Sequence, residues 1–344
     1  MSLASFINLA ERIPLPASII RFGIRSLVAR TRARHLPPDA SREAVFAESM
    51  RDYPIAEHTD AANAQHYEVP AEFFRLVLGP NRKYSCCLFD TPAATLEDAE
   101  LAALEKTVEH ADLHDGMHIL ELGCGWGSLS LHMAARFPRS RILSVSNSAS
   151  QRATIERRAE ELGLTNLEVV TADMNAFDTK ERFDRIVSVE MFEHMSNWSE
   201  LLERCRRWVK PEGRLFLHVF THEHASYRFD REDPADWIAR HFFTGGIMPA
   251  RSLAHCFPES FSVQQEWRWQ GVHYAMTARH WLASFDRSAA EIATVLQPVY
   301  GPETALWMRR WRWFFLATEG LFGHADGDVW GVNHYLMAPV TEGP

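Results

Sequence analysis

The stretch MHILELGCGWGS, residues 117–128, joins a short apolar run to a turn that contains three glycines. The apolar run predicts a buried strand over residues 117–122, and the next segment, 128–137, has the spacing of a helix. The glycines form a GxGxG turn, which differs from the GxGxxG turn of dinucleotide-binding proteins. Such a turn lets the backbone approach a ligand closely, but it also suits a tight strand-to-helix connection. The ligand therefore has to be argued from the surrounding residues.

The alternation of strand and helix continues after this turn. Further strands are predicted at residues 141–147, 167–174, 183–190 and 214–221, and helices at 149–164 and 198–210. Strands that alternate with helices form a parallel sheet of right-handed βαβ units. The sequence thus predicts a doubly wound α/β domain, in which ligands bind at the carboxyl ends of the strands. Two later strands are predicted at 262–269 and 332–340, with a helical stretch between them.

The composition excludes several classes of protein. The formal net charge of −9 argues against nucleic acid as a partner, because proteins that bind it usually carry a basic surface. The five cysteines are an odd number without a CxxC pair, so they indicate neither a disulfide framework nor a zinc site. They favour a reducing, cytoplasmic compartment. Polar residues interrupt the N-terminal apolar stretch, and no apolar run reaches the length of about 18 residues that spans a membrane.

The first 35 residues carry six arginines and a single acid, Glu11. Within them, residues 19–34 place apolar side chains on one helical stripe and arginines on another. A basic amphipathic helix can make a weak contact with an anionic membrane surface. It can also pack on the acidic remainder of its own chain or on a sister subunit of a homodimer, and we favour packing. Residues 35–41, HLPPDAS, predict a linker after this helix.

Carboxylates near the glycine turn indicate a cationic ligand. Glu121 precedes Gly123 by two residues, and Asp173 follows the third predicted strand. A pyrophosphate needs a positive or amide-rich cradle, whereas a carboxylate suits a cation such as S-adenosylmethionine. The second strand ends without the acid that usually holds ribose hydroxyls, so the neutral side chains of Ser146, Asn147 and Gln151 would have to do this.

Seven collinear motifs give the sequence a family resemblance. They are HYEVPAEFF (66–74), YSCCLF (84–89), ELGCGWGS (121–128), FDRIVSVEMFEHM (183–195), LHVFTH (217–222), FFTGGIMP (242–249) and WGVNHYL (330–336). Together they resemble the S-adenosylmethionine-dependent methyltransferases related to cyclopropane-fatty-acid synthase, and within that family the coclaurine N-methyltransferase branch. The resemblance implies a class I methyltransferase fold, a Rossmann-like seven-stranded sheet whose last strand is antiparallel.

The resemblance also implies four segments and a set of cofactor contacts. Residues 1–60 would be a helical extension, 61–116 a helical segment over the cofactor, 117–225 the cofactor-binding core, and 226–344 a helical substrate cap with the last two strands. The methionine part of S-adenosylmethionine would lie between Tyr84 and Ser85 on one side and Gly123 and Gly125 on the other. Its ribose would lie by Ser146, Asn147 and Gln151, and its adenine by Asp173 and Met174.

Glu190 is where the chain departs from the cyclopropane synthases. In those enzymes the matching residue is glycine, and a bicarbonate ion serves as the base. The residues matching the ligands of that ion are Cys86, Glu193, His218 and Tyr274. Because two adjacent anions in a closed pocket repel each other, a glutamate here should exclude bicarbonate. The amine methyltransferase branch carries glutamate at this position.

The segment that begins at Glu190 holds the predicted catalytic residues. Glu193 and His194 follow at spacings of three and four, which would bring all three to one side of a helical turn. An amine must lose its proton before it can attack a methyl group. We expect Glu190 to anchor the ammonium and His194 to accept its proton, with Glu193 orienting His218 or sharing the amine. A lone Glu or His here would more simply cap a helix.

An aromatic stripe lies between the two late strands. Trp307, Trp311, Phe314, Phe315 and Thr318 share one helical face. Such stripes are usually core, but the resemblance places Trp311 and Phe314 against an aromatic substrate, so we expect part core and part pocket wall. Phe322 and Trp330 are lesser candidates for the wall. The irregular spacing of the histidines indicates no metal site, and transfer from a sulfonium requires no metal.

Three functions compete. The sequence favours a small-amine N-methyltransferase that converts S-adenosylmethionine to S-adenosylhomocysteine and acts on an aromatic or heterocyclic amine. An enzyme that methylates or cyclopropanates an unsaturated lipid is the second, and the basic helix supports it whereas Glu190 does not. A cofactor-binding protein without catalysis is the third, which the intact glycines and acids make improbable.

Overall fold

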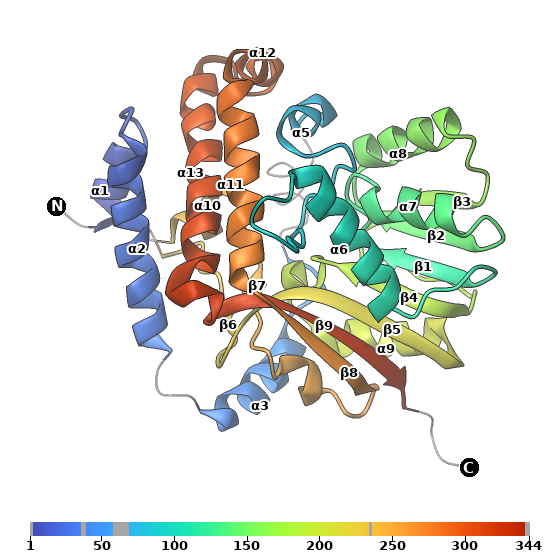
Figure 1. Ribbon diagram of the computed structural model, residues 1–344. Helices are drawn as coiled ribbons and strands as arrows, with labels where there is room; N and C mark the ends of the chain where they lie inside the picture. Colours follow the sequence, from blue (N-terminus) through green and yellow to red (C-terminus); the bar gives the residue numbers. More distant parts are fainter. Residues whose placement is uncertain (1–2, 36–38, 58–68, 234–235, 341–344) are drawn as a thin grey trace.

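A mixed seven-stranded sheet forms the centre of the computed structural model, which describes residues 3–35, 39–57, 69–233 and 236–340 (Figure 1). The strand order is β3-β2-β1-β4-β5-β9-β8. The strands are β1 (His118–Leu122), β2 (Arg141–Ser146), β3 (Leu167–Thr171), β4 (Phe183–Val189), β5 (Val209–His222), β8 (Phe261–Gln270) and β9 (Trp330–Pro339). The first five pair in parallel and β9 is antiparallel to both of its neighbours. The predicted strands and the antiparallel last strand are confirmed, although β5 begins five residues earlier than predicted.

Alternating apolar side chains bury both faces of the sheet. Ile119 and Ile142 face a layer made by α6 (Leu96–His110) and α7 (Ser128–Arg136), whereas Leu120 and Leu143 face α9 (Trp198–Trp208). The helix α8 (Ala149–Glu161) covers β3. A capping box of Thr95 and Asp98 starts α6. Because helices cover both faces, only the strand ends are left to form a ligand site.

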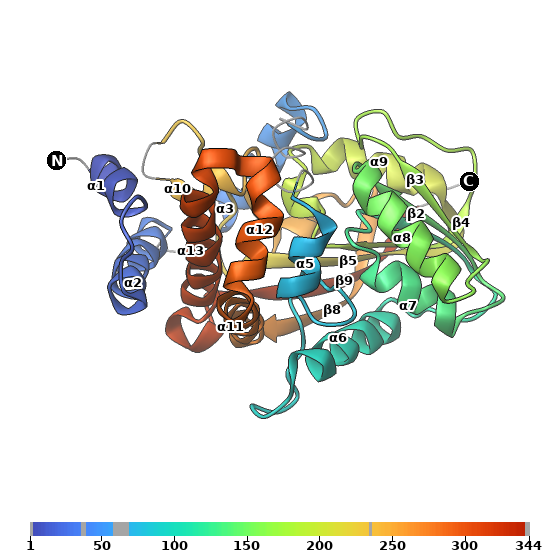
Figure 2. The ribbon, with the colours of Figure 1, turned by 90° about the horizontal axis from the view of Figure 1, so that it is seen from above.

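A helical cap stands beside the carboxyl ends of the parallel strands (Figures 1 and 2). It consists of α10 (Trp237–His241), α11 (Gly271–Arg287), α12 (Ala289–Tyr300) and α13 (Thr304–Phe322), of which the last three are inserted between β8 and β9. Gly271, the first residue of α11, lies against the backbone of β9. A β-carbon at this position would come 2.1 Å from the carbonyl oxygen of Trp330, so only glycine fits. A short ribbon of β6 (Tyr227–Arg228) and β7 (Ile247–Met248) lies in the connection after β5.

The N-terminal helices pack on this cap. The helix α2 (Ala17–Arg34) runs along α13, with Ile20 and Val28 buried and Arg21 paired with Glu319 at 2.8 Å. The expectation that the basic helix packs on its own chain is therefore confirmed. Its opposite face is exposed, with 53% of Ile19 and 73% of Phe22 accessible to solvent.

The remaining N-terminal elements connect the extension to the core. They are α1 (Leu3–Ala10), α3 (Ala40–Ser49), η1 (Met50–Asp52) and α5 (Ala71–Val77). Residues 36–38 of the predicted linker, residues 66–68 of the first family motif and the boundary predicted at residue 60 lie outside the described residues. Among the helices that are described, none has the length and apolarity needed to cross a membrane.

Candidate active site

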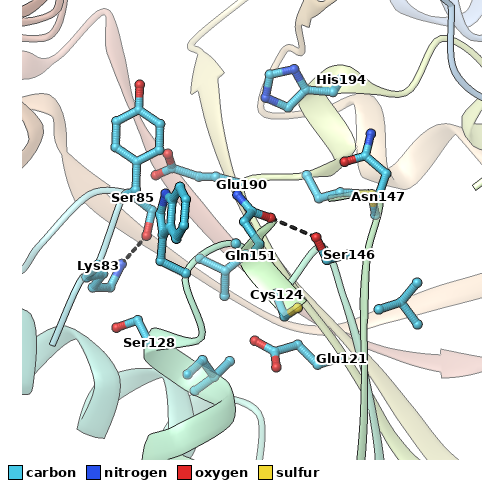
Figure 3. Close-up of a pocket in the computed structure, with 18 of the residues that line it drawn as sticks. Lys83, Ser85, Glu121, Cys124, Ser128, Ser146, Asn147, Gln151, Glu190 and His194 are labelled. Atoms are coloured by element: carbon cyan, nitrogen blue, oxygen red, sulfur yellow. Dashed lines mark hydrogen bonds between the residues drawn. The ribbon is translucent and has the colours of Figure 1, made fainter. Parts of the chain in front are cut away.

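A cavity lies at the carboxyl ends of β1, β2 and β4, beneath the cap (Figure 3). All nine predicted cofactor-contact residues line it: Tyr84, Ser85, Gly123, Gly125, Ser146, Asn147, Gln151, Asp173 and Met174. Of the predicted catalytic and substrate residues, Glu190, His194, Tyr274 and Phe314 also line it. The topology thus brings together segments that are up to 230 residues apart in the chain.

The glycine turn brings backbone to the floor of the cavity. Gly125 has φ +51° and nothing within 4 Å of the place where a β-carbon would stand. Gly123 has φ +79°, and a β-carbon there would come 2.6 Å from the side chain of Met191. Both positions therefore require glycine, the first because of its backbone conformation and the second also because of its close approach to the β4 end.

The side chains around this floor are polar. The Ser146 hydroxyl donates to Gln151 Oε1 at 2.7 Å, and Asp173 Oδ1 accepts the backbone N–H of Asn175 at 2.7 Å. Behind them the Glu121 carboxylate accepts hydrogen bonds from two serine hydroxyls, and burial raises its pKa to about 7. The carboxyl ends of the strands thus place carboxyl groups and neutral acceptors around the cavity. These groups suit a cationic ligand better than an anionic one.

Glu190 is held in place by hydrogen bonds to three residues. It follows β4 with φ +48°, a left-handed conformation that turns its side chain away from the strand direction. Its Oε1 accepts the Cys86 backbone N–H at 2.9 Å and faces His218 Nε2 at 3.1 Å, and its Oε2 accepts the Tyr274 hydroxyl at 2.6 Å. Burial raises the pKa of Glu190, an effect opposed by the nearby Lys83 ammonium and by these hydrogen bonds.

His194 and Glu193 point in different directions, which corrects the expectation that they share one side with Glu190. The short turn η3 (Phe192–His194) places the His194 ring on the cavity, stacked on Phe243 with ring centres 4.5 Å apart. Glu193 is fully buried away from the cavity, and its Oε1 accepts the Phe220 backbone N–H at 2.7 Å. Glu193 therefore does not line the cavity, and its hydrogen-bond partner is Phe220 rather than His218. Burial and the neighbouring Glu190 charge raise its pKa well above the usual range.

Aromatic side chains from the cap and the neighbouring segments form a wall of the cavity. This wall consists of Phe220, Phe243, Tyr274, Trp281 and Phe314. Trp311, which we expected on the wall, is instead fully buried between Phe73 and Phe242. The predicted mixed stripe on α13 is thus split so that Phe314 faces the cavity and Trp311 belongs to the core. Cys86 and His218 also lie behind Glu190 and do not line the cavity.

The whole arrangement matches a known family. The sequence model of the mycolic acid cyclopropane synthetase family matches residues 56–332. The chain belongs to this family. Among its relatives, (S)-coclaurine N-methyltransferase of Thalictrum flavum subsp. glaucum is 34% identical over 294 residues, which cover 84% of this chain and 81% of that one. The cyclopropane-fatty-acyl-phospholipid synthase of Escherichia coli K12 is 31% identical over 271 residues, covering 78% and 66%.

A crystal structure of a relative agrees closely with this fold. The structure of coclaurine N-methyltransferase bound to N-methylheliamine and S-adenosylhomocysteine is 33% identical, with a TM-score of 0.90 over 94% of this chain and 95% of that one. The class I methyltransferase fold is thereby confirmed. The chain is an S-adenosylmethionine-dependent methyltransferase of the coclaurine N-methyltransferase branch of the family.

The polar groups of the cavity fit this cofactor. Within the described residues, four buried polar atoms of cavity-lining side chains have no hydrogen-bond partner: Trp126 Nε1, Ser128 Oγ, Asn147 Oδ1 and Trp281 Nε1. A buried polar group without a partner is costly, so a molecule that brings matching donors and acceptors to these atoms is favoured in the cavity. The amino-acid and ribose parts of S-adenosylmethionine offer such groups, and the carboxylates nearby suit its positive charge.

Lys83 belongs to this site although sequence reasoning did not select it. Its side chain is buried, and its ammonium donates to Ser85 Oγ and, at 2.7 Å, to the carbonyl oxygen of Cys86. These hydrogen bonds fix the backbone of residues 83–86, the first three of which line the cavity, and the ammonium supplies a positive charge near Glu190. Its one signal in the sequence is its position directly before the YSCCLF motif.

Proposed function

We propose that this methyltransferase transfers a methyl group to the nitrogen of a small aromatic or heterocyclic amine. The observation that carries the proposal is the carboxylate of Glu190, which accepts hydrogen bonds from Cys86 and Tyr274 and lies 3.1 Å from His218 Nε2. These residues match three of the bicarbonate ligands in cyclopropane synthases. Because the carboxylate already takes up their donors, the space and the charge that bicarbonate needs are gone.

The carboxylate of Glu190 suits an amine because most alkylamines are cations at neutral pH. Its side chain is 8% exposed and borders the cavity, so an ammonium there would meet a negative charge that water screens little. Bound S-adenosylmethionine supplies an electrophilic methyl group on a sulfonium. The protein must therefore hold the nitrogen in line and accept its proton.

We assign the proton acceptor to His194, which borders the cavity and is only partly buried. Imidazoles ordinarily have a pKa of about 6.5, so they are largely neutral at working pH and can take a proton. General-base catalysis of this kind contributes roughly 10²–10⁴ in rate. Correct positioning of the two reactants contributes more, up to roughly 7–11 kcal/mol. We therefore expect Glu190, which positions the amine, to matter at least as much as the base.

The aromatic wall supports an aromatic substrate. Phe243 and Phe314 present ring surfaces to the cavity, and Tyr274 lies beside Glu190 with its hydroxyl bonded to the carboxylate. A cation that is held near an aromatic face gains roughly 0.5–2 kcal/mol. The names of the relatives, which include pavine and tetrahydroprotoberberine N-methyltransferases, agree with ring-bearing amines.

A lipid substrate is the second candidate, and the outer face of α2 favours it. Exposed Ile19 and Phe22 lie on that face beside exposed Arg25 and Arg30, an arrangement that suits an anionic membrane surface. Membrane contact alone, however, does not require a lipid substrate. The choice depends on which molecule receives the methyl group.

The experiment supplies the protein with S-adenosylmethionine that carries a labelled methyl group, a panel of aromatic and aliphatic amines, and anionic phospholipid vesicles. We expect labelled methyl on ring-bearing amines and none on vesicle lipid, as read by mass spectrometry. A Glu190→Gln variant should lose about 10- to 100-fold in kcat/KM, because a charge-assisted hydrogen bond is worth about 1.5–3 kcal/mol. The loss should shrink at high pH, where the free amine needs no anchor.

The matched control is Glu212→Gln, which changes an exposed acid away from the cavity and should leave the rate unchanged. Labelled lipid, with no labelled amine, would select the second candidate. An unchanged rate and amine affinity in Glu190→Gln would remove the anchor role.

A further inference from the structure

Three imidazoles form a hydrogen-bonded chain behind Glu190. His218 Nε2 faces Glu190 Oε1 at 3.1 Å, His218 Nδ1 faces His334 Nε2 at 2.8 Å, and His334 Nδ1 faces His110 Nδ1 at 2.8 Å. His218 on β5 and His334 on β9 are register partners, and His110 is the last residue of α6. The three imidazoles thus run from the residue that follows β4 along the face of the sheet that α6 covers, to the last residue of α6.

The three imidazoles are buried from solvent. His218 and His334 are 1% and 0% exposed, and the end member His110 is 6% exposed. The His110 ring stacks on Trp267 with ring centres 3.9 Å apart, while Trp269 packs against both inner rings. Burial lowers the pKa of His218 and His334 well below the ordinary value and that of His110 to about 4. All three rings are therefore neutral at neutral pH.

Neutral imidazoles impose one direction on the whole chain. Each has one N–H donor and one bare nitrogen acceptor, so the role of each nitrogen fixes the role of the next. An ionised Glu190 can only accept, which requires a proton on His218 Nε2. His218 Nδ1 must then accept from His334 Nε2, and His334 Nδ1 must accept from His110 Nδ1. A proton on Glu190 Oε1 would require the opposite tautomer in every ring.

We propose that His334 and His110 are positioning residues that hold His218 as the Nε2–H donor to Glu190 and so keep the carboxylate facing the amine ionised. The amine in this inference rests on the proposed function, whereas the hydrogen-bonded imidazoles do not depend on it. It assigns separate tasks to the two cavity groups. Protonation of Oε1 would oblige three buried rings to change tautomer together, and protonation of Oε2 would compete with the hydrogen bond that it accepts from the Tyr274 hydroxyl. Glu190 therefore remains an anchor and the substrate proton goes to His194.

Other groups also act on the charge of Glu190. Those that face it are Lys83, Cys86, Glu193, His194 and Tyr274, while Lys106 and Glu109 lie near His110. None of the first group contacts His334 or His110 by a hydrogen bond in the described part of the chain. Substitutions at the far end of the imidazole chain can therefore be made without altering them.

Two substitutions at His110 distinguish the effect of its N–H donor from the effect of its ring. His110→Phe keeps a ring to stack on Trp267 but removes the donor to His334 Nδ1, whereas His110→Gln keeps an N–H donor. In His110→Phe the inner rings are free to reverse, so the acid limb of the pH profile of kcat/KM should move up by about one unit, with an increase in the KM for amine. In His110→Gln the limb should stay close to that of the wild type.

The control is His132→Phe, which replaces a partly buried imidazole of α7 that is not a member of the three and should leave the pH profile unchanged. Because a merely structural role for His110 would lower stability in both His110 variants without moving the limb, an unmoved limb in a folded His110→Phe would overturn the proposal.

A second readout needs no turnover. Nitrogen NMR of the protein labelled at histidine nitrogens should show protons on Nε2 of His218 and His334 and on Nδ1 of His110 throughout the neutral pH range. A His218 ring protonated on Nδ1, or one that carries charge at neutral pH, would overturn the proposal. If the tautomers are as expected but no amine is methylated, the proposed function fails and the chain stands.

Discussion

Glu190 and Glu193 show how strongly two carboxyl groups three residues apart can differ. The left-handed backbone at Glu190 turns its side chain to the cavity, where it forms hydrogen bonds with three residues. The next turn carries Glu193 into the protein, where Oε1 has one backbone donor and Oε2 has no partner among the described residues. A buried carboxyl group with so little support favours its protonated form. The two acids are therefore suited to different tasks, one to hold charge and the other to remain neutral.

The raised pKa of Glu193 has a consequence for stability. The unfolded chain releases this proton above its ordinary pKa of about 4.3, whereas the folded chain retains it, so stability is lost as the pH rises from that value towards the folded pKa. Glu193→Gln keeps an acceptor for the Phe220 N–H and cannot ionise. We expect the variant to be more stable than the wild type by about 1–3 kcal/mol at pH 7, with a difference that vanishes near pH 4. Thermal unfolding at several pH values measures this difference, and a constant difference across pH would contradict the assignment.

At the scale of single elements, the glycine turn between β1 and α7 joins the fold to the ligand. Its left-handed residues end the strand and open the helix, and they also bring backbone rather than side chains to the cavity floor. Gly125 and Gly163 both have a positive φ, +51° and +68°, and at neither does the place that a β-carbon would occupy have another group within 4 Å. Of the two, Gly125 lines the cavity and Gly163 does not. The pair therefore separates the cost of backbone strain from the cost of blocking a ligand.

Alanine at these two glycines should give different results. Each substitution should lower stability by about 1–2 kcal/mol because alanine is disfavoured in the left-handed region. Gly125→Ala should in addition weaken the binding of S-adenosylhomocysteine at least tenfold, equivalent to about 1.4 kcal/mol, because its methyl group enters the cavity. Calorimetric titration of both variants measures this. Equal affinities in the two variants would show that the turn does not approach the cofactor.

The elements were more predictable from the sequence than the directions of their side chains. Short apolar runs in the sequence predict β1, β2, β4 and β9, and the glycine turn indicates where the cavity lies. The direction of Glu193 depends on a left-handed residue and a short turn, neither of which has a signal in VEMFEHM. Helical spacing likewise grouped Trp311 with Phe314 but could not tell which one packs on α5. The imidazole chain joins residues 110, 218 and 334, which only the sheet register and α6 bring together.

At the scale of the whole molecule, the N-terminal extension is bound to the cap that supplies the aromatic wall. Glu11, at the end of α1, is 3% exposed and accepts hydrogen bonds from Arg310 on α13 at 2.8 Å and from Trp237 on α10 at 2.9 Å. The apolar side of α2 packs along the same helix α13, whose Phe314 lines the cavity. The extension and the cap should therefore behave as one cooperative unit, joined at a buried ion pair.

Breaking that ion pair should loosen the unit. Burial would raise the pKa of Glu11, but the hydrogen bonds from Arg310 and Trp237 outweigh it and the pKa is lowered overall. Glu11→Ala leaves the largely buried Arg310 without its partner, which should cost about 3 kcal/mol at pH 7. Since a lowered pKa gives stability that is lost as the pH falls through it, the gap between wild type and variant should close in acid.

Hydrogen exchange and thermal unfolding distinguish a local effect from a general one. Exchange in Glu11→Ala should accelerate together in α1, α10 and α13 while the sheet stays protected, because only the cap unit loses a tie. Arg25→Ala, which removes an exposed arginine from α2, serves as the control and should change neither quantity. Faster exchange confined to α1 would show that the extension is an independent appendage and that the first 35 residues do not support the aromatic wall of the cavity.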